Sequence, residues 1–162
     1  MDIARRRFLT FGVLCATAII AKPVLACPNV EKIVTVAKTF VGSTDYKDDS
    51  LQLCFDVYHK AKIRLRERYD TTRSHYQLTA RATRKIKDLK TQHGAIMIWQ
   101  RNSMSAPMYA ALYLGGDEVL TSWRYKDGFT PTPQVDITSH NSVARLPYFR
   151  GYIPVFTIAR GD

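Results

Sequence analysis

The clearest structural signal in the chain is the stretch Tyr109-Ala-Ala-Leu-Tyr-Leu-Gly-Gly-Asp-Glu-Val-Leu-Thr-Ser-Trp123. Two runs of apolar and aromatic residues flank Gly115-Gly-Asp117, and glycine readily adopts the backbone conformations that tight turns require. The pattern predicts a β-hairpin with strands over 109–114 and 118–123. Because a hairpin is an antiparallel unit, we expect the second half of the chain to form an antiparallel sheet.

Two further strands are predicted on either side of this hairpin. One is Ala95-Ile-Met-Ile-Trp99 and the other, near the C-terminus, is Gly151-Tyr-Ile-Pro-Val-Phe-Thr-Ile158. Pro154 indicates that the last strand is an edge strand or carries a bulge, since proline cannot donate to a ladder. The segment Thr130-Pro-Thr-Pro133 is predicted to break the chain between these strands.

Two helices are predicted before the strands. Apolar residues recur at three- and four-residue spacing over 28–41, and Gly42 ends that pattern. A second helix begins near Ser50 or Leu51, with Ser50 as the candidate N-cap. Helices followed by a meander, without strand–helix–strand alternation, indicate one α+β domain.

The segment 62–92 is strongly basic and contains few large apolar residues. We interpret it as a solvated helix and connector, with an anion-binding surface as the alternative. Its two tyrosines, Tyr69 and Tyr76, are too sparse for a platform that stacks nucleic-acid bases.

The N-terminus has the pattern of an export signal. Three arginines, Arg5-Arg-Arg7, precede an apolar run over 8–21 that is too short to span a membrane, and Val24-Leu-Ala26 offers small residues for cleavage. We therefore predict a signal over 1–26 and a mature domain over 27–162. The segment around the arginines resembles a twin-arginine signal, and an ordinary Sec signal stays open.

Cys27 follows the predicted cleavage site directly. The sequence Val24-Leu-Ala-Cys27 resembles a lipoprotein box, in which Cys27 would be lipidated and would anchor the protein to a membrane. A free Cys27 and a disulfide with Cys54 stay open as alternatives. In each case we expect the protein in the periplasm or cell envelope.

The charge of the chain limits its partners. The net charge is +10, and removal of residues 1–26 lowers it to +7 because four cationic residues and one anionic residue are lost. A basic exported domain suits anionic partners such as the cell wall, lipid head groups or an acidic protein, and nucleic acid is not expected. The sequence predicts no cofactor and shows no metal-ligand spacing.

Cys54 is a candidate nucleophile because it lies in the first turns of the second predicted helix. The partial positive charge at a helix N-terminus lowers a thiol pKa and favours the thiolate. The alternative is a small buried hydrophobic residue, and placement alone favours that interpretation.

The order and spacing of these elements resemble the NlpC/P60 branch of the papain-like cysteine peptidases, over about residues 30–123. The resemblance rests on five segments, which are one helix with the loop that follows it, the segment around Cys54 and three strands: Ile33–Tyr46, Leu53–Tyr58, Gly94–Ile98, Tyr109–Gly115 and Val119–Ser122. The resemblance implies a papain-like fold in which N-terminal helices pack on an antiparallel sheet. It also implies peptidase activity on cell-wall stem peptides, with Cys54 as nucleophile.

The departures from this family indicate a broken active site. The family's catalytic histidine falls on Tyr109, a poor base near neutral pH, and its third polar residue falls near Thr121 or Ser122. His93 is the first choice for a substitute base and His75 the second. Of the other two histidines, His59 should point away from Cys54, and His140 is expected to be a solvated loop residue.

Two functions follow from the resemblance. In the first, the domain is catalytically degenerate and binds peptidoglycan or an envelope or secreted protein, with Tyr109 filling the space of the lost base. In the alternative, it is an active thiol hydrolase that uses Cys54 and a non-standard base such as His93. The aromatic residues of the strands are interpreted mainly as core, with a sugar or peptide groove as the alternative: Trp99, Tyr109, Tyr113, Trp123 and Tyr125.

Overall fold

A computed structural model of the chain describes residues 30–47, 49–66, 72–82, 93–100 and 108–160, with only the backbone over 72–76. The predicted export signal, its cleavage site and Cys27 lie outside the described residues.

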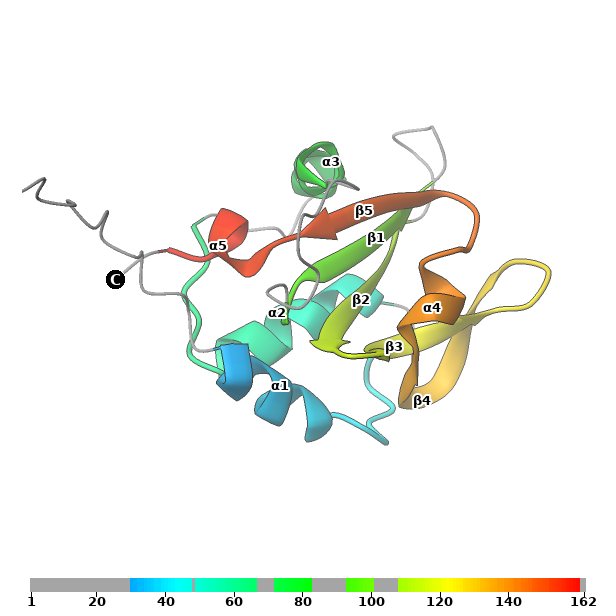
Figure 1. The fold of residues 1–162 in the computed structure, drawn as a ribbon, viewed down its shortest axis with the longest axis horizontal. Helices are drawn as coiled ribbons and strands as arrows, with labels where there is room; N and C mark the ends of the chain where they lie inside the picture. Colours follow the sequence, from blue (N-terminus) through cyan, green and yellow to red (C-terminus); the bar gives the residue numbers. More distant parts are fainter. Residues whose placement is uncertain (1–29, 48, 67–71, 83–92, 101–107, 161–162) are drawn as a thin grey trace, which may run out of the picture.

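The described part is an α+β domain built on one antiparallel sheet, as the sequence predicts (Figure 1). The spatial order of the strands is β4-β3-β2-β1-β5. β2 and β3 form the predicted hairpin, with Leu112 opposite Leu120. The last strand, β5, pairs with β1 on the other side of the sheet from β4. The strand bounds are β1 Ile96–Gln100, β2 Met108–Gly115, β3 Glu118–Tyr125, β4 Phe129–Ser139 and β5 Phe149–Ile153.

The helices are divided between the two faces of the sheet. Their bounds are α1 Val30–Lys38, α2 Ser50–Lys60, α3 Thr72–Arg81, α4 His140–Val143 and α5 Val155–Ile158. The first two lie together across one face, and the short α4 lies at the β4 side of the sheet (Figure 1). Among the described helices, none is long and apolar enough to cross a membrane.

Each face of the sheet carries its own hydrophobic core. Ile98, Leu112 and Leu120 face the helical layer, where they meet Cys54 of α2. The opposite face carries an aromatic core, which includes Trp99, Tyr113 and Trp123 and is joined by Val143 of α4. Successive residues of a strand point to opposite faces, so a shift of one position decides which core a side chain joins.

Strand β4 corrects the prediction of a chain break at 130–133. The strand includes Pro131 and Pro133 because it is an edge strand. One side of an edge strand has no partner, so the N–H that proline lacks costs no hydrogen bond there. A large bulge separates two registers: Thr121 pairs with Asp136, but Trp123 pairs with Pro131.

The bulge is hydrogen-bonded to the loop between α1 and α2. The N–H of Val135 donates to the Ser43 carbonyl at 2.8 Å, and the Val135 carbonyl accepts from the Gly42 N–H at 2.9 Å. The Val135 side chain is buried in the helical core. This end of β4 is therefore held in place.

Two smaller predictions also need correction. The last strand ends at Ile153 rather than 158, because Pro154 precedes the short helix α5, although β5 is an edge strand as predicted. The N-cap of α2 is Asp49, whose carboxylate accepts from the Gln52 N–H at 2.8 Å. Ser50 is instead the first residue of the helix.

Candidate functional site

Cys54, the predicted nucleophile, is a free and fully buried cysteine. Its exposed fraction is 0%, and its thiol donates to the Ser50 carbonyl one turn earlier, with 3.5 Å between the Sγ and oxygen atoms. Burial raises the pKa of the thiol, and the charge of Asp49 raises it further. The group is therefore neutral at physiological pH, whereas nucleophilic attack needs the thiolate.

Of the two interpretations of Cys54, the buried one is confirmed. The helix terminus stabilises a negative charge by about 0.3–1 kcal/mol within its first turn, which is less than one pKa unit. Full burial shifts a pKa by as much as about 3–5 units. Burial dominates, and the Asp49 carboxylate at the start of α2 opposes the helix dipole as well.

The start of α2 is hydrogen-bonded to the middle of the sheet. The Ser50 hydroxyl accepts from the Ala110 N–H at 2.9 Å, and the Trp123 indole N–H donates to the Ala110 carbonyl at 2.5 Å. Both backbone groups of Ala110 thus bond to side chains, one from α2 and one from β3. These bonds hold the start of α2 against the sheet, and Cys54 has no exposed surface.

Tyr109 lies on the other face of the sheet from Cys54. Its ring stacks on Phe129, with 4.5 Å between centroids, and meets the edge of Trp123 at 6.2 Å. Both partners belong to the aromatic core, whereas Cys54 belongs to the helical core. The prediction that Tyr109 fills the space beside Cys54 is therefore wrong, because the alternation of β2 directs its side chain away from α2.

Thr121 and His93 do not join Cys54 either. Thr121 is buried near Trp123 and Val143 of the aromatic core, where it lines a groove described below. The His93 ring meets the edge of Tyr113, with 5.9 Å between centroids, and lies against Gly115, where a Cβ atom would be 2.5 Å from Nε2. The four predicted site residues are thus not gathered into one site.

Tyr58, on the same helix as Cys54, is also fully buried. One turn along α2, the Tyr58 hydroxyl donates to the Gly94 carbonyl, and burial raises the pKa of this tyrosine. The His93 and His140 rings both contact Tyr113, which belongs to the aromatic core on the other face of the sheet. His59 is exposed, as predicted, and the side chain of His75 lies outside the described residues.

Comparisons with known proteins add no relative. No family model, curated protein or solved structure matches the chain. Within the described ranges, no cluster of histidine, cysteine, aspartate or glutamate residues is arranged to hold a metal ion.

His140 is a buried residue, which corrects the prediction of a solvated loop histidine. Its exposed fraction is 7%, and its Nε2 atom is hydrogen-bonded to the Tyr152 hydroxyl at 2.6 Å. It begins α4, which Ser139 caps through its hydroxyl, and the Ser139 hydroxyl also donates to Asp117 at 2.7 Å. Ser139 is a typical N-cap residue and could have indicated this helix from the sequence. No sequence pattern indicated that His140 would pair with Tyr152.

His140 should make the domain less stable in mild acid. Burial lowers its pKa from 6.5, against a smaller opposing effect of Asp117. Below pH 6.5 the unfolded state therefore binds a proton that the folded state resists, so stability falls as pH drops, by at most about 1.4 kcal/mol per unit. The Asp117 carboxyl, whose pKa is lowered chiefly by the Ser139 hydroxyl, acts in the same direction but only below pH 3.8.

Urea unfolding at pH 7.5 and pH 5.0 measures this effect. The wild-type chain should lose stability between the two values, and His140→Gln should lose less. His59→Gln, which changes an exposed histidine, should behave like the wild type. Equal losses in wild type and His140→Gln would show that another group carries the effect.

A groove of about 550 Å³ runs along β3 and the bulged part of β4. Thr121 and Trp123 line its buried part, while the exposed lining residues come from both strands: Arg124, Tyr125, Pro133, Gln134 and Asp136. β-Bulges are over-represented at sheet edges and beside active sites, where they redirect side chains. The groove lies at such an edge, because β4 is the outer strand of the sheet.

The groove combines three kinds of recognition group. Arg124 offers a planar, permanently charged donor, Asp136 and Gln134 offer oxygen acceptors, and Tyr125 offers a ring that is 36% exposed. The sequence pattern did not indicate Arg124, Gln134 and Asp136, because 130–133 was interpreted as a chain break and the bulge was not foreseen. Only Thr121, Trp123 and Tyr125 were among the residues singled out.

Proposed function

We propose that the chain is a non-catalytic NlpC/P60-like domain that is exported and binds peptidoglycan of the cell envelope through the β3–β4 groove. The observation that carries the proposal is the complete burial of the Cys54 thiol, while the His93 and His140 rings contact Tyr113 on the other face of the sheet. A cysteine hydrolase requires an accessible thiolate and an adjacent base. A binding domain requires neither.

The location and charge of the chain support an envelope ligand. The pattern at 1–26 is that of an export signal, and the remaining domain has a net charge of +7. Peptidoglycan carries carboxylates on its peptides, and a basic domain is attracted to such a polymer over distances set by the ionic strength.

The groove supplies groups that match this polymer. Arg124 can form paired hydrogen bonds with a peptide carboxylate. Asp136 and Gln134 can bond to amide and hydroxyl groups, and the exposed ring of Tyr125 can cover an apolar part of a sugar or peptide. The groove lies on the aromatic face, away from Cys54, so binding there needs no contribution from the thiol.

Co-sedimentation with purified insoluble peptidoglycan tests the proposal. The full chain is expressed with its own signal and purified as the host processes it. Arg124→Ala should weaken retention by at least about fivefold, the change typical of an important interface residue. Lys126→Ala is the matched control, because it removes the same charge from the same hairpin outside the groove lining, and it should change retention less than twofold.

Two results would contradict the proposal. Equal weakening by Arg124→Ala and Lys126→Ala would indicate general charge attraction instead of groove binding. No retention of the wild-type chain would remove peptidoglycan as the ligand and would favour a protein partner.

A further inference from the structure

A second surface of the domain concentrates exposed cations. After α2 the chain runs antiparallel to its own C-terminal segment, with a bridge between Leu65 and Ala159. The Arg160 N–H donates to the Arg64 carbonyl at 2.6 Å, and the Arg66 N–H donates to the Ile158 carbonyl at 2.9 Å. Leu65 packs against the helical core, which leaves Arg64 and Arg66 exposed on either side of it.

The backbone pairing brings three exposed arginines close together. Arg64, Arg66 and Arg160 are exposed, and Lys62 at the end of α2 is exposed beside them in sequence. The Arg66 side chain is further held by a hydrogen bond from its Nε to the Ala159 carbonyl at 2.7 Å. The ion pair formed among the described residues is Lys38 with Glu118, which lies outside this patch.

An exposed aromatic residue lies four positions before Arg160 in the chain. Phe156 of α5 is 59% exposed, more than any other large hydrophobic residue in the described part of the chain. Its neighbours Val155 and Ile158 are buried, so the short helix is anchored and Phe156 projects outward. We name Lys62, Arg64, Arg66, Phe156 and Arg160 the basic–aromatic patch.

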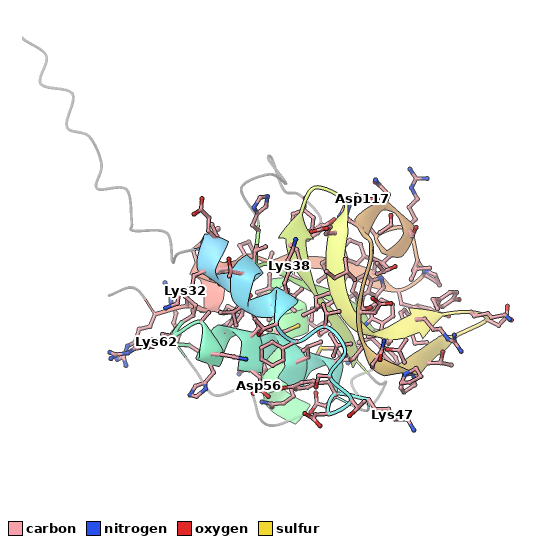
Figure 2. The ribbon with its side chains drawn as sticks, turned by 90° about the horizontal axis from the view of Figure 1, so that it is seen from below. Lys32, Lys38, Lys47, Asp56, Lys62 and Asp117 are labelled. Carbon is pink, nitrogen blue, oxygen red and sulfur yellow. The ribbon has the colours of Figure 1, made fainter. Side chains whose placement is uncertain are left out.

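The patch lies at the end of the domain where α1 begins. A Cβ atom on Gly94 would lie 3.1 Å from Ile33 of α1 and 3.2 Å from Val155 of α5, which places these two helices side by side. Figure 2 shows Lys32 and Lys62 at this same end, with Lys47 at the opposite end.

We propose that the basic–aromatic patch docks the folded domain on an anionic phospholipid surface. The arginines and Lys62 attract anionic head groups, and Phe156 inserts at the boundary between head groups and acyl chains. Lipid is favoured over a soluble polyanion because an exposed phenylalanine gains nothing from phosphate groups alone. The inference rests on the proposed envelope location but uses a surface other than the groove.

The test is co-sedimentation with two kinds of vesicle. One kind is a mixture of phosphatidylglycerol and phosphatidylcholine, and the other is phosphatidylcholine alone. The full chain carries Cys27→Ser throughout, so that no acyl anchor contributes. We expect binding to the mixed vesicles, weakening with salt, and at least tenfold weaker binding to phosphatidylcholine alone.

Matched variants separate the patch from general charge. Arg64→Glu with Arg160→Glu should weaken binding at least tenfold. Lys47→Glu with Lys126→Glu changes the net charge equally at other exposed sites and should have less than a threefold effect. Phe156→Ala should weaken binding severalfold, and Tyr125→Ala should not.

Three results would overturn the inference. They are equal effects of the two charge-reversed pairs, full binding by Phe156→Ala, or equal binding to both kinds of vesicle. Peptidoglycan retention distinguishes a failure here from a failure of the proposed function, because Arg124→Ala should affect only peptidoglycan and the patch variants should chiefly affect vesicles.

Discussion

The Cys54 thiol of the native domain should react with iodoacetamide at pH 8 at least about 100-fold more slowly than the same thiol in the unfolded chain. The thiol has no exposed surface, so labelling must wait for a local opening of the structure. Openings of core elements require several kcal/mol, and about 3 kcal/mol already gives a 100-fold protection. The raised pKa slows the reaction further.

The measurement is mass spectrometry of the labelled fraction against time, in a chain that carries Cys15→Ser and Cys27→Ser. A second chain with Cys54→Ala and His59→Cys provides the control, since position 59 is on the same helix and exposed. That thiol should react at an ordinary rate. Rapid labelling of Cys54 below pH 8 would contradict its assignment as a structural cysteine and would favour the hydrolase.

Trp123→Ala should destabilise the domain by about 3–5 kcal/mol, as expected for a buried tryptophan. The side chain is 3% exposed and contacts several rings of the aromatic core, with centroid distances of 4.8 Å to Trp99 and 5.1 Å to Phe129. Its indole also satisfies the Ala110 carbonyl at 2.5 Å. Removal leaves a cavity and an unpaired backbone acceptor at the junction of β2 and β3.

Guanidinium unfolding followed by circular dichroism measures the loss. Trp123→Phe keeps a ring but removes the indole donor, so it should cost less than Trp123→Ala, and the hydrogen-bond component should be about 1–3 kcal/mol. Tyr125→Ala, two residues along the same strand and 36% exposed, should cost less than about 1.5 kcal/mol. Similar losses for Trp123→Ala and Tyr125→Ala would mean that the aromatic core is not the one described here.

The sequence predicted the elements of this fold better than their packing. The glycines at 115 and 116 marked the β2–β3 turn, and the apolar periodicities marked α1 and α2, because these signals are local. The course of β4 was missed because its prolines lie at an edge and beside a bulge, which depend on the position of the strand in the whole sheet.

The candidate site was harder to predict because both faces of the sheet are buried. The residues Ala110, Ala111, Leu112 and Tyr113 are all apolar or aromatic, so their sequence does not say which of them face α2. Tyr109 was therefore placed beside Cys54 in the resemblance, whereas it belongs to the opposite core. The His140–Tyr152 pair was missed for a related reason, since its partners are twelve residues apart on different elements.

The most direct test of the central claim compares the wild-type chain with Cys54→Ala on purified peptidoglycan. The amount of protein retained and the amino groups released into solution are measured in parallel. We expect equal retention of the two proteins and no release above the protein-free blank. Release of amino groups by the wild-type chain that disappears in Cys54→Ala would contradict this expectation and would establish Cys54 as a catalytic nucleophile.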